Sequence, residues 1–162
     1  MDDMREKAAP VTLLVLDVDG VLTDGRVYVG PEGEALKVFS MRDGHGLWLV
    51  REAGIEVALI TREDSVFVRR RAEKLKIEHV ITGSLDKRAA LRDLAERLGR
   101  RREQVAYVGD DVIDLEALQW AGFAACPADA EEEIRGIVDF IAERPGGHGA
   151  VRDICNFLLR AR

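Results

Sequence analysis

Residues 12–25 read TLLVLDVDGVLTDG, and this stretch decides the fold. Its first part, residues 12–16, is a short run of branched and apolar side chains, which is typical of a strand covered on both faces. Two carboxylates, Asp17 and Asp19, follow the run directly, and Gly20 comes after them. We therefore expect a buried strand that ends in an acidic loop containing a glycine.

The same apolar signature returns along the chain, and helical patterns separate its occurrences. Further strands are predicted at residues 56–60, 77–81 and 104–108 and, more weakly, at 123–126 and 137–141. Helices are predicted at residues 64–75, 87–98, 113–120, 129–136 and 150–159, with Asp64 and Asp129 as N-caps. Strands that alternate with helices form right-handed βαβ units. The pattern predicts an α/β fold, a three-layer α/β/α sandwich around a mainly parallel, Rossmann-like sheet.

One segment interrupts this alternation. Residues 26–29 and 34–39 flank the turn-rich sequence Gly-Pro-Glu-Gly at residues 30–33, so a projecting β-hairpin is expected at about residues 26–40. The hairpin carries several apolar side chains that it cannot bury alone, which points to a partner surface. The alternative, that the hairpin folds back on its own core, is equally compatible with the sequence.

The composition fits one domain and excludes several classes of protein. The chain has 162 residues, 47% of them hydrophobic, which is enough for one buried core. With 24 basic and 30 acidic residues the net charge is 24 − 30 = −6, the wrong sign for holding nucleic acid or an anionic membrane. The two cysteines form no CxxC motif, and no apolar run reaches the roughly 18 residues of a membrane span. We expect a cytoplasmic protein without nucleic-acid or membrane partners, with residues 1–10 frayed and residues 11–162 forming one domain.

Polar side chains follow the predicted strands at the points where these strands end. They are Asp17 and Asp19 after the first strand, Thr61 after the second, Asp110, Asp111 and Asp114 after residues 104–108, and Lys87 at the start of a helix. The carboxyl ends of parallel strands form the ligand-binding edge of such a sheet. Clustered carboxylates repel unless a cation lies among them, and Mg²⁺ prefers oxygen ligands. The sequence therefore predicts a Mg²⁺ site, although each Asp taken singly also fits a helix cap or a turn.

These residues resemble the four motifs of the haloacid dehalogenase-like hydrolases in type, order and spacing. The matching segments are DVDGVLTD at 17–24, Thr61, Lys87 and GDDVID at 109–114. DVDGVLTDG, GEALKVFSMRDGHG, VAYVGDDVID and PGGHGAVRDI also make the chain similar to the small phosphatases that act on 3-deoxy-manno-octulosonate 8-phosphate. The resemblance implies Mg²⁺-dependent hydrolysis of a 2-keto-3-deoxy sugar acid phosphate through an aspartyl-phosphate.

The resemblance also implies roles for the residues that would meet the phosphate. Asp17 is the expected nucleophile, and Asp19 is the expected general acid and base. Thr61 and Lys87 are expected to hold the phosphoryl oxygens as charge redistributes. Gly20 lets the backbone approach the phosphate closely.

A metal centre is implied by the same motifs. Mg²⁺ is expected between the carboxylates of Asp17 and Asp110 and the backbone carbonyl of Asp19, where it would neutralise phosphate charge. Asp111 and Asp114 are expected to lie behind these ligands and to orient metal-bound water or the nearby lysine.

Many members of the superfamily cover this site with a separate cap domain, for which this chain leaves no room between its motifs. Because a pocket normally buries most of its ligand, another subunit is expected to supply the missing wall. The resemblance implies a homotetramer whose hairpins meet at its centre. Contacts to the substrate in a neighbour's site are then expected from Arg42, Asp43, Gly44, Arg71 and Lys74, which otherwise fit an ordinary solvated surface.

The sequence departs from the octulosonate phosphatase pattern after the second strand. That group usually reads Thr-Gly-Arg there, whereas this chain has Arg62 and Glu63 after its threonine, and both are expected to contact the substrate. Glu63 and Lys74 favour a nine-carbon sialic-type acid 9-phosphate, whereas RDG at residues 42–44 favours the octulosonate. His148 stands where the group often has arginine, and it fits a structural role as well as a functional one.

Two other classes of protein place similar residues on a similar fold. A receiver domain of phosphorelay signalling also gathers acidic residues, a threonine and a lysine at the edge of a parallel sheet, but in a different order along the chain. A non-catalytic tetramerisation domain of the same fold would lack the catalytic residues, all of which are present here. The phosphatase interpretation is therefore favoured over both.

Overall fold

The structure is a computed structural model and describes residues 2–162. Its centre is a parallel sheet with the strand order β5-β4-β1-β6-β7-β8. These strands are β1 (Leu13–Leu16), β4 (Glu56–Ile60), β5 (His79–Ile81), β6 (Val105–Val108), β7 (Phe123–Cys126) and β8 (Phe140–Ile141). The register places Leu16 of β1 beside Val108 of β6, so the two strands end at the same level.

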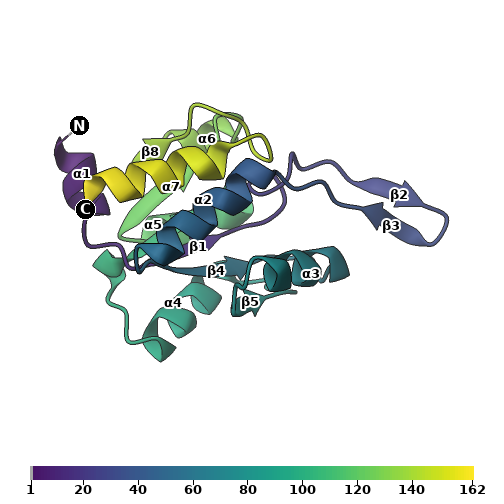
Figure 1. Ribbon diagram of the computed structural model, residues 1–162, viewed down its shortest axis with the longest axis horizontal. Helices are drawn as coiled ribbons and strands as arrows, with labels where there is room; N and C mark the ends of the chain where they lie inside the picture. The colour runs from purple at the N-terminus through teal and green to yellow at the C-terminus, as the bar shows by residue number, and fades with distance from the viewer. Residues whose placement is uncertain (1) are drawn as a thin grey trace.

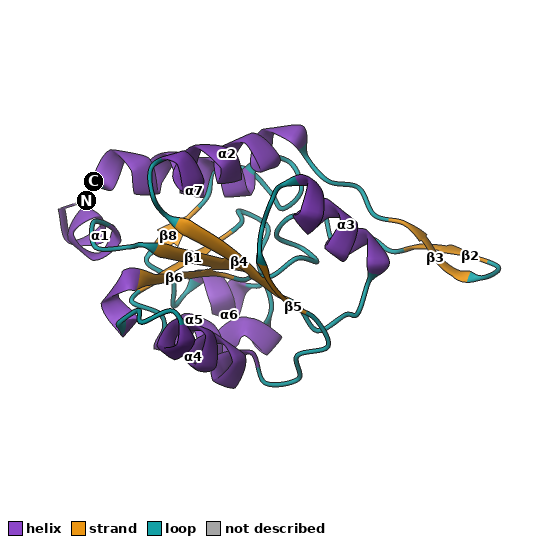
Figure 2. Cartoon of the chain, turned by 60° about the horizontal axis from the view of Figure 1, so that its bottom comes forward, coloured by secondary structure: helices purple, strands orange, loops and turns teal. Residues whose placement is uncertain are grey.

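Helices cover both faces of the sheet, as Figure 2 shows. One face carries α2 (Met41–Glu52), α3 (Val66–Lys74) and α7 (Ala150–Ala161), with α1 (Asp2–Ala8) against α7. The other face carries α4 (Lys87–Arg97), α5 (Leu115–Trp120) and α6 (Glu132–Arg135). This arrangement confirms the predicted three-layer α/β/α sandwich.

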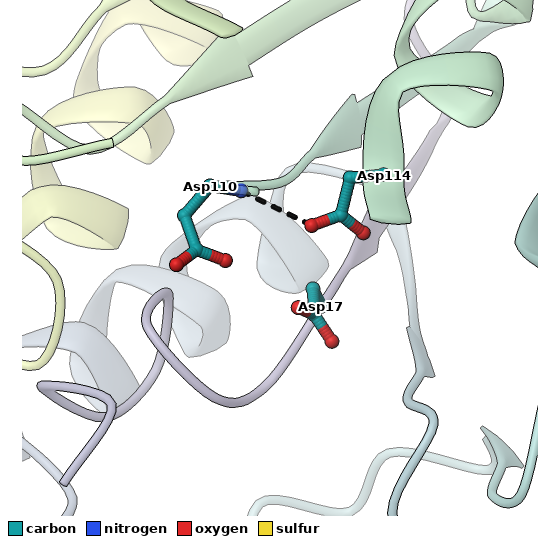
Figure 3. A group of neighbouring side chains, drawn as sticks. All are labelled: Asp17, Asp110 and Asp114. Carbon is teal, nitrogen blue, oxygen red and sulfur yellow. Dashed lines mark hydrogen bonds between the residues drawn. The ribbon is translucent and has the colours of Figure 1, made fainter. Parts of the chain in front are cut away.

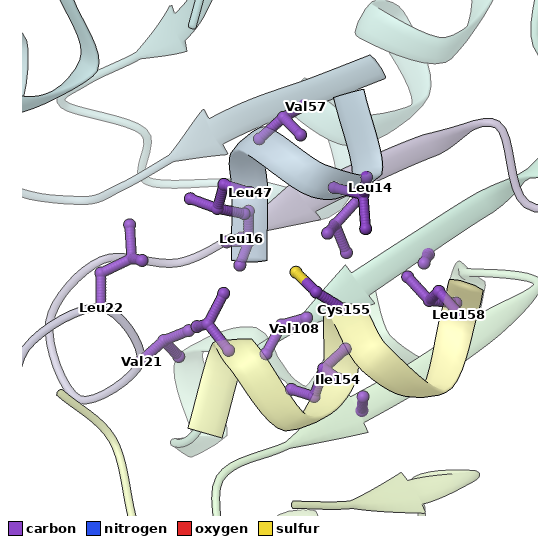
Figure 4. Packing of buried hydrophobic residues seen from close by; sticks show 14 of the residues in the cluster. Leu14, Leu16, Val21, Leu22, Leu47, Val57, Val108, Ile154, Cys155 and Leu158 are labelled. Atoms are coloured by element: carbon purple, nitrogen blue, oxygen red, sulfur yellow. The ribbon is translucent and has the colours of Figure 1, made fainter. Parts of the chain in front are cut away.

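The alternation of side chains along β1 explains why its run is apolar throughout. Leu14 and Leu16 pack on the side of α2 and α7, where Cys155 and Leu158 of α7 face them (Figure 4). Leu13 packs on the opposite face of the sheet, among the buried apolar side chains of α4 and α5. Because both faces of the strand are buried, nearly every position in it favours an apolar residue.

The hairpin consists of β2 (Tyr28–Gly30) and β3 (Gly33–Leu36) and projects away from the sandwich (Figure 1). Val29 near its tip is 75% exposed, and Val27 and Val38 are also exposed. The projecting hairpin is confirmed, and the alternative that it packs on its own core does not hold for this part of the chain.

Several local expectations were wrong. The start of the chain is not frayed: Asp2–Ala8 form α1, whose Ala8 is buried and whose Lys7 Nζ lies 2.7 Å from Asp139 Oδ1, while Met1 lies outside the described residues. Ser65 and Glu131 occupy the N-cap positions expected for Asp64 and Asp129. Asp129 instead accepts a hydrogen bond from Gly146 N.

Two further features lie at the periphery of the fold. Trp48 of α2 is 48% exposed and stacks on the ring of His45. The last strand, expected over residues 137–141, is reduced to β8 at the edge of the sheet. Among residues 2–162, no helix combines the length and apolar character needed to cross a membrane.

Candidate active site

The site lies at the carboxyl ends of β1 and β6, where the chain leaves the sheet. Asp17 follows β1, and its backbone N–H donates to Val108 O at the end of β6 over 2.9 Å. Gly109 and Asp110 follow β6, so the parallel register brings Asp110 beside Asp17. A short 3₁₀ turn, Val112–Asp114, then returns Asp114 to the same place. Figure 3 shows the three carboxylates turned toward one another.

Three carboxylates and one ammonium form the centre of the site. Asp17, Asp110 and Asp114 each offer an oxygen within 4.8 Å of the others. Lys87, the first residue of α4, places Nζ 2.9 Å from Asp17 Oδ1 and 2.7 Å from Asp114 Oδ1. The side chain of Asp86 caps this helix by accepting from Ala89 N, which fixes the position of Lys87. One positive charge therefore faces three negative charges in a buried space.

Burial, together with this imbalance of charge, raises the pKa of two carboxyl groups. Burial, followed by the charge of Asp114, raises the pKa of Asp17 to about 7, against the opposing effect of Lys87. Burial, followed by the charges of Asp17 and Asp114, raises the pKa of Asp110 to about 8. Burial alone would lower the pKa of Lys87, but Asp17 and Asp114 outweigh it and the pKa is raised. The site thus favours a proton or a cation among its carboxylates.

Asp114 is fully buried and holds its neighbours in place. Its Oδ1 accepts from Tyr107 OH over 2.8 Å as well as from Lys87, and its Oδ2 accepts from the backbone N–H of Asp110 over 3.2 Å. Through these contacts Asp114 orients Lys87 and the Asp110 loop. Asp111 is exposed, and its Oδ1 accepts from Val112 N at the start of the 3₁₀ turn.

The remaining oxygens fit a hard divalent cation. Asp110 Oδ1 is buried and has no hydrogen-bond partner within residues 2–162. Gly20 packs against the same carboxylate, with φ +85°, and a Cβ at this position would overlap Asp110 Oδ2. An unpartnered buried carboxylate oxygen is costly unless a ligand satisfies it. Since every ligand atom here is an oxygen, the residues fit Mg²⁺, which the carboxylates of Asp17 and Asp110 could hold.

A hollow of about 230 Å³ opens from the carboxylates to the surface. Its lining includes seven of the predicted site residues: Asp17, Asp19, Thr61, Arg62, Glu63, Asp110 and Asp111. Thr61 is buried after β4, and its backbone N–H donates to Ile81 O. Arg62 and Glu63 are exposed at the mouth. The structure therefore brings the residues of all four motifs to one edge of the sheet.

The residues expected to contact substrate in a neighbouring subunit lie outside this hollow. Arg42 and Lys74 are exposed, and neither lines the hollow of its own chain. Arg71 donates to Ser40 O over 3.1 Å and lies over the ring of Phe39. Gly44 is buried close to the Arg71 guanidinium.

Asp43 has a structural task, contrary to the expectation that it contacts substrate. Its side chain is buried, with 1% of the residue exposed, and its carboxylate accepts from Gly149 N over 3.3 Å and from Arg152 N over 2.9 Å. These amides belong to the start of α7, so Asp43 ties α2 to the N-terminus of α7. Nearby His148 is exposed.

Sequence reasoning missed Lys37, which follows β3 at the base of the hairpin. Its Nζ lies 2.6 Å from Asp19 Oδ1 and 3.1 Å from Glu34 Oε2, and its side chain is 2% exposed. Glu34 in turn accepts from Ser65 Oγ over 3.1 Å. A lone lysine in a hairpin reads as a surface residue, so the sequence alone carried no signal for this contact. Tyr107 was also missed, because a tyrosine inside an apolar strand looks like an ordinary core residue.

A larger hollow of about 360 Å³ lies at the opposite edge of the sheet. In its lining, Glu56 accepts from His79 Nε2 over 2.8 Å and from Arg100 over 3.2 Å. This hollow is larger than the one at the carboxyl ends of β1 and β6, but its Glu56 carboxylate already has two hydrogen-bond partners. The uncompensated carboxylates at the other edge identify the candidate active site.

Comparison with known proteins agrees with this geometry. The family model for haloacid dehalogenase-like hydrolases matches residues 49–152. The chain is 42% identical over 160 residues to the 3-deoxy-D-manno-octulosonate 8-phosphate phosphatase of Escherichia coli (strain K12), covering 99% of this chain and 85% of that protein.

Two solved structures are also close to it. One is 3-deoxy-D-manno-octulosonate 8-phosphate phosphatase from Moraxella catarrhalis in complex with magnesium ion, phosphate ion and KDO, with TM-score 0.97, 40% identity, and coverage of 100% of this chain and 93% of that chain. The other is the cobalt-bound deoxy-D-mannose-octulosonate 8-phosphate phosphatase from Haemophilus influenzae, with TM-score 0.93, 39% identity, and coverage of 96% and 91%. Because the family model covers most of the chain and these relatives match nearly all of it, the chain belongs to the haloacid dehalogenase-like hydrolases.

Proposed function

We propose that this protein is a Mg²⁺-dependent phosphatase that hydrolyses 3-deoxy-D-manno-octulosonate 8-phosphate. The observation that carries the proposal is the buried cluster of Asp17, Asp110 and Lys87, in which Asp110 keeps one oxygen without a partner. The substrate follows from relatives that are 42% identical along 99% of the chain and are named for this reaction.

The chain's own residues can divide the reaction into two displacements. A carboxylate oxygen of Asp17 attacks phosphorus, the bond from phosphorus to the sugar oxygen breaks, and Asp19 gives that oxygen its proton. Asp19 then takes a proton from the water that releases phosphate from Asp17. Lys87 Nζ, already 2.9 Å from Asp17 Oδ1, and Thr61 hold the phosphoryl oxygens. Mg²⁺, when bound, would neutralise phosphate charge so that the anionic nucleophile can approach.

A nine-carbon sialic-type acid 9-phosphate is the second candidate substrate. Glu63 lines the hollow beside Thr61, at the position where it favours the longer acid, whereas Lys74, the other such residue, does not reach the hollow of its own chain. The two substrates are separated by kcat/KM for each phosphate under the same Mg²⁺ concentration. A larger kcat/KM for the nine-carbon phosphate would overturn the octulosonate assignment while leaving the phosphatase reaction in place.

The reaction itself is tested by release of inorganic phosphate with and without EDTA. Native protein is expected to require Mg²⁺, and Asp17→Asn is expected to abolish turnover while circular dichroism stays unchanged. Steady-state hydrolysis by Asp17→Asn would remove Asp17 as the nucleophile. Inactivity of the native protein toward every phosphate would favour a receiver-like or tetramerisation domain instead.

We further propose a cytoplasmic homotetramer joined through the hairpin. The support is the run of exposed apolar side chains on and beside β2 and β3, Val27, Val29 and Val38 among them. In such an assembly Arg42 and Lys74 could reach a neighbour's hollow, which their own chain does not allow. Multi-angle light scattering tests the assembly, and a fully active monomer would contradict it.

A further inference from the structure

Lys37 occupies an unusual position for a lysine in a hairpin. Its side chain is almost completely buried, and its ammonium lies between Asp19 Oδ1 at 2.6 Å and Glu34 Oε2 at 3.1 Å. Fixing a flexible lysine in one conformation costs side-chain entropy, which these two ion pairs offset.

The contact is anchored on both sides. Glu34 Oε1 accepts from Ser65 Oγ over 3.1 Å, and Ser65 is the N-cap residue of α3. A chain of polar contacts therefore runs from α3 through Glu34 and Lys37 to Asp19. Within residues 2–162, the Asp19 carboxylate accepts a hydrogen bond from Lys37 alone, and its second oxygen has no partner.

We propose that Lys37 is a positioning residue for proton transfer: it fixes Asp19 through Oδ1 and leaves Oδ2 to carry the proton to the leaving oxygen. This inference rests on the proposed phosphatase reaction. The bond between Oδ2 and its proton breaks, the proton bonds to the departing oxygen, and the ammonium stabilises the carboxylate that remains. Without Lys37 the Asp19 side chain, 31% exposed, is free to rotate toward solvent.

The experiment compares two aryl phosphates that differ in their need for a proton. The para-nitrophenolate ion leaves readily without protonation, whereas phenolate depends more on a general acid. The quantity to measure is kcat/KM, because it reports the steps up to departure of the leaving group and excludes later attack by water. The variant is Lys37→Met, which keeps the length of the side chain without its charge, and Lys76→Met, an exposed lysine at the other edge, is the control.

For Lys37→Met we expect kcat/KM to fall at least about 10-fold for phenyl phosphate and less than about 3-fold for para-nitrophenyl phosphate, since general acids contribute about 10²- to 10⁴-fold. Lys37→Arg should recover part of the loss. If Lys37→Met does not fold, Glu34→Gln weakens the same clamp and should steepen the dependence on leaving group in the same direction.

Equal losses on the two substrates, or a change confined to KM, would overturn the inference, because a structural or substrate-binding role does not distinguish the leaving groups. Native protein that hydrolyses aryl phosphates but not the octulosonate phosphate would overturn the substrate assignment alone, and the comparison would still decide the role of Lys37. Native protein inert toward every phosphate would overturn both.

Discussion

Replacing Asp110 by Asn is expected to stabilise the metal-free protein, increasingly so as pH rises. The pKa of Asp110 is raised from 3.8 to about 8 by burial and by neighbouring carboxylates. In the unfolded chain this carboxyl ionises near its ordinary pKa. Between about pH 4 and pH 8 the folded protein therefore holds a proton that the unfolded chain has lost, and its free energy of unfolding falls as pH rises. Asp110→Asn removes this contribution.

The magnitude follows from the width of that window. Between the unfolded and folded pKa values, one such carboxyl group lowers the free energy of unfolding by about 1.4 kcal/mol for each pH unit. From about pH 5 to about pH 8, the native protein should therefore lose about 4 kcal/mol relative to Asp110→Asn. Asp110 Oδ1 has no hydrogen-bond partner, so the new amide can gain or lose hydrogen bonds there. Their effect on the free energy of unfolding is the same at both pH values and cancels in the comparison.

Urea unfolding followed by circular dichroism, in EDTA at both pH values, measures this difference. Glu133→Gln, an exposed carboxylate on α6, controls for the change in net charge. Adding Mg²⁺ should reverse the order, because a ligand that binds the folded state stabilises only the protein that retains its ligating carboxylate. The same pH dependence in native protein and Asp110→Asn, in EDTA, would refute the reasoning.

Two further substitutions test the packing around the site. Gly20→Ala should reduce Mg²⁺-dependent turnover about 100-fold by displacing the Asp110 carboxylate, and should cost about 1–2 kcal/mol of stability from its positive φ; unchanged kinetics would show that Asp110 can move freely. Asp43→Ala should lower the free energy of unfolding by about 1–3 kcal/mol, because Gly149 N and Arg152 N lose their acceptor, with little effect on kcat/KM. A large rise in KM with unchanged stability would restore Asp43 as a substrate contact.

The fold could be predicted from the sequence because the buried strands of a parallel sheet have a distinctive apolar pattern. A strand such as β1, buried on both faces, must be apolar at nearly every position, and a functional residue can stand only where the strand ends. The positions of Asp17, Thr61 and Asp110 at one edge of the sheet could therefore be predicted from the sequence.

The rest depends on contacts that no local pattern encodes. Lys37 and Asp19 are 18 positions apart and meet only because the hairpin turns back at its base. Asp43 lies in a motif that suggested substrate binding. Its carboxylate instead accepts a hydrogen bond from the backbone N–H of Gly149, which is 106 positions away in the sequence. Asp2–Ala8 have a charged sequence, and their helix forms against α7 rather than from its own propensity.

The hairpin gives the proposed assembly a kinetic signature. Lys37, whose ammonium contacts Asp19, lies one residue beyond β3. The hairpin that would contact neighbouring subunits therefore also positions a residue of the active site. Specific activity should then fall as the enzyme is diluted below the dissociation constant of the assembly, and it should return on concentration. Progress curves recorded across a dilution series would read the strength of subunit association directly from phosphate release.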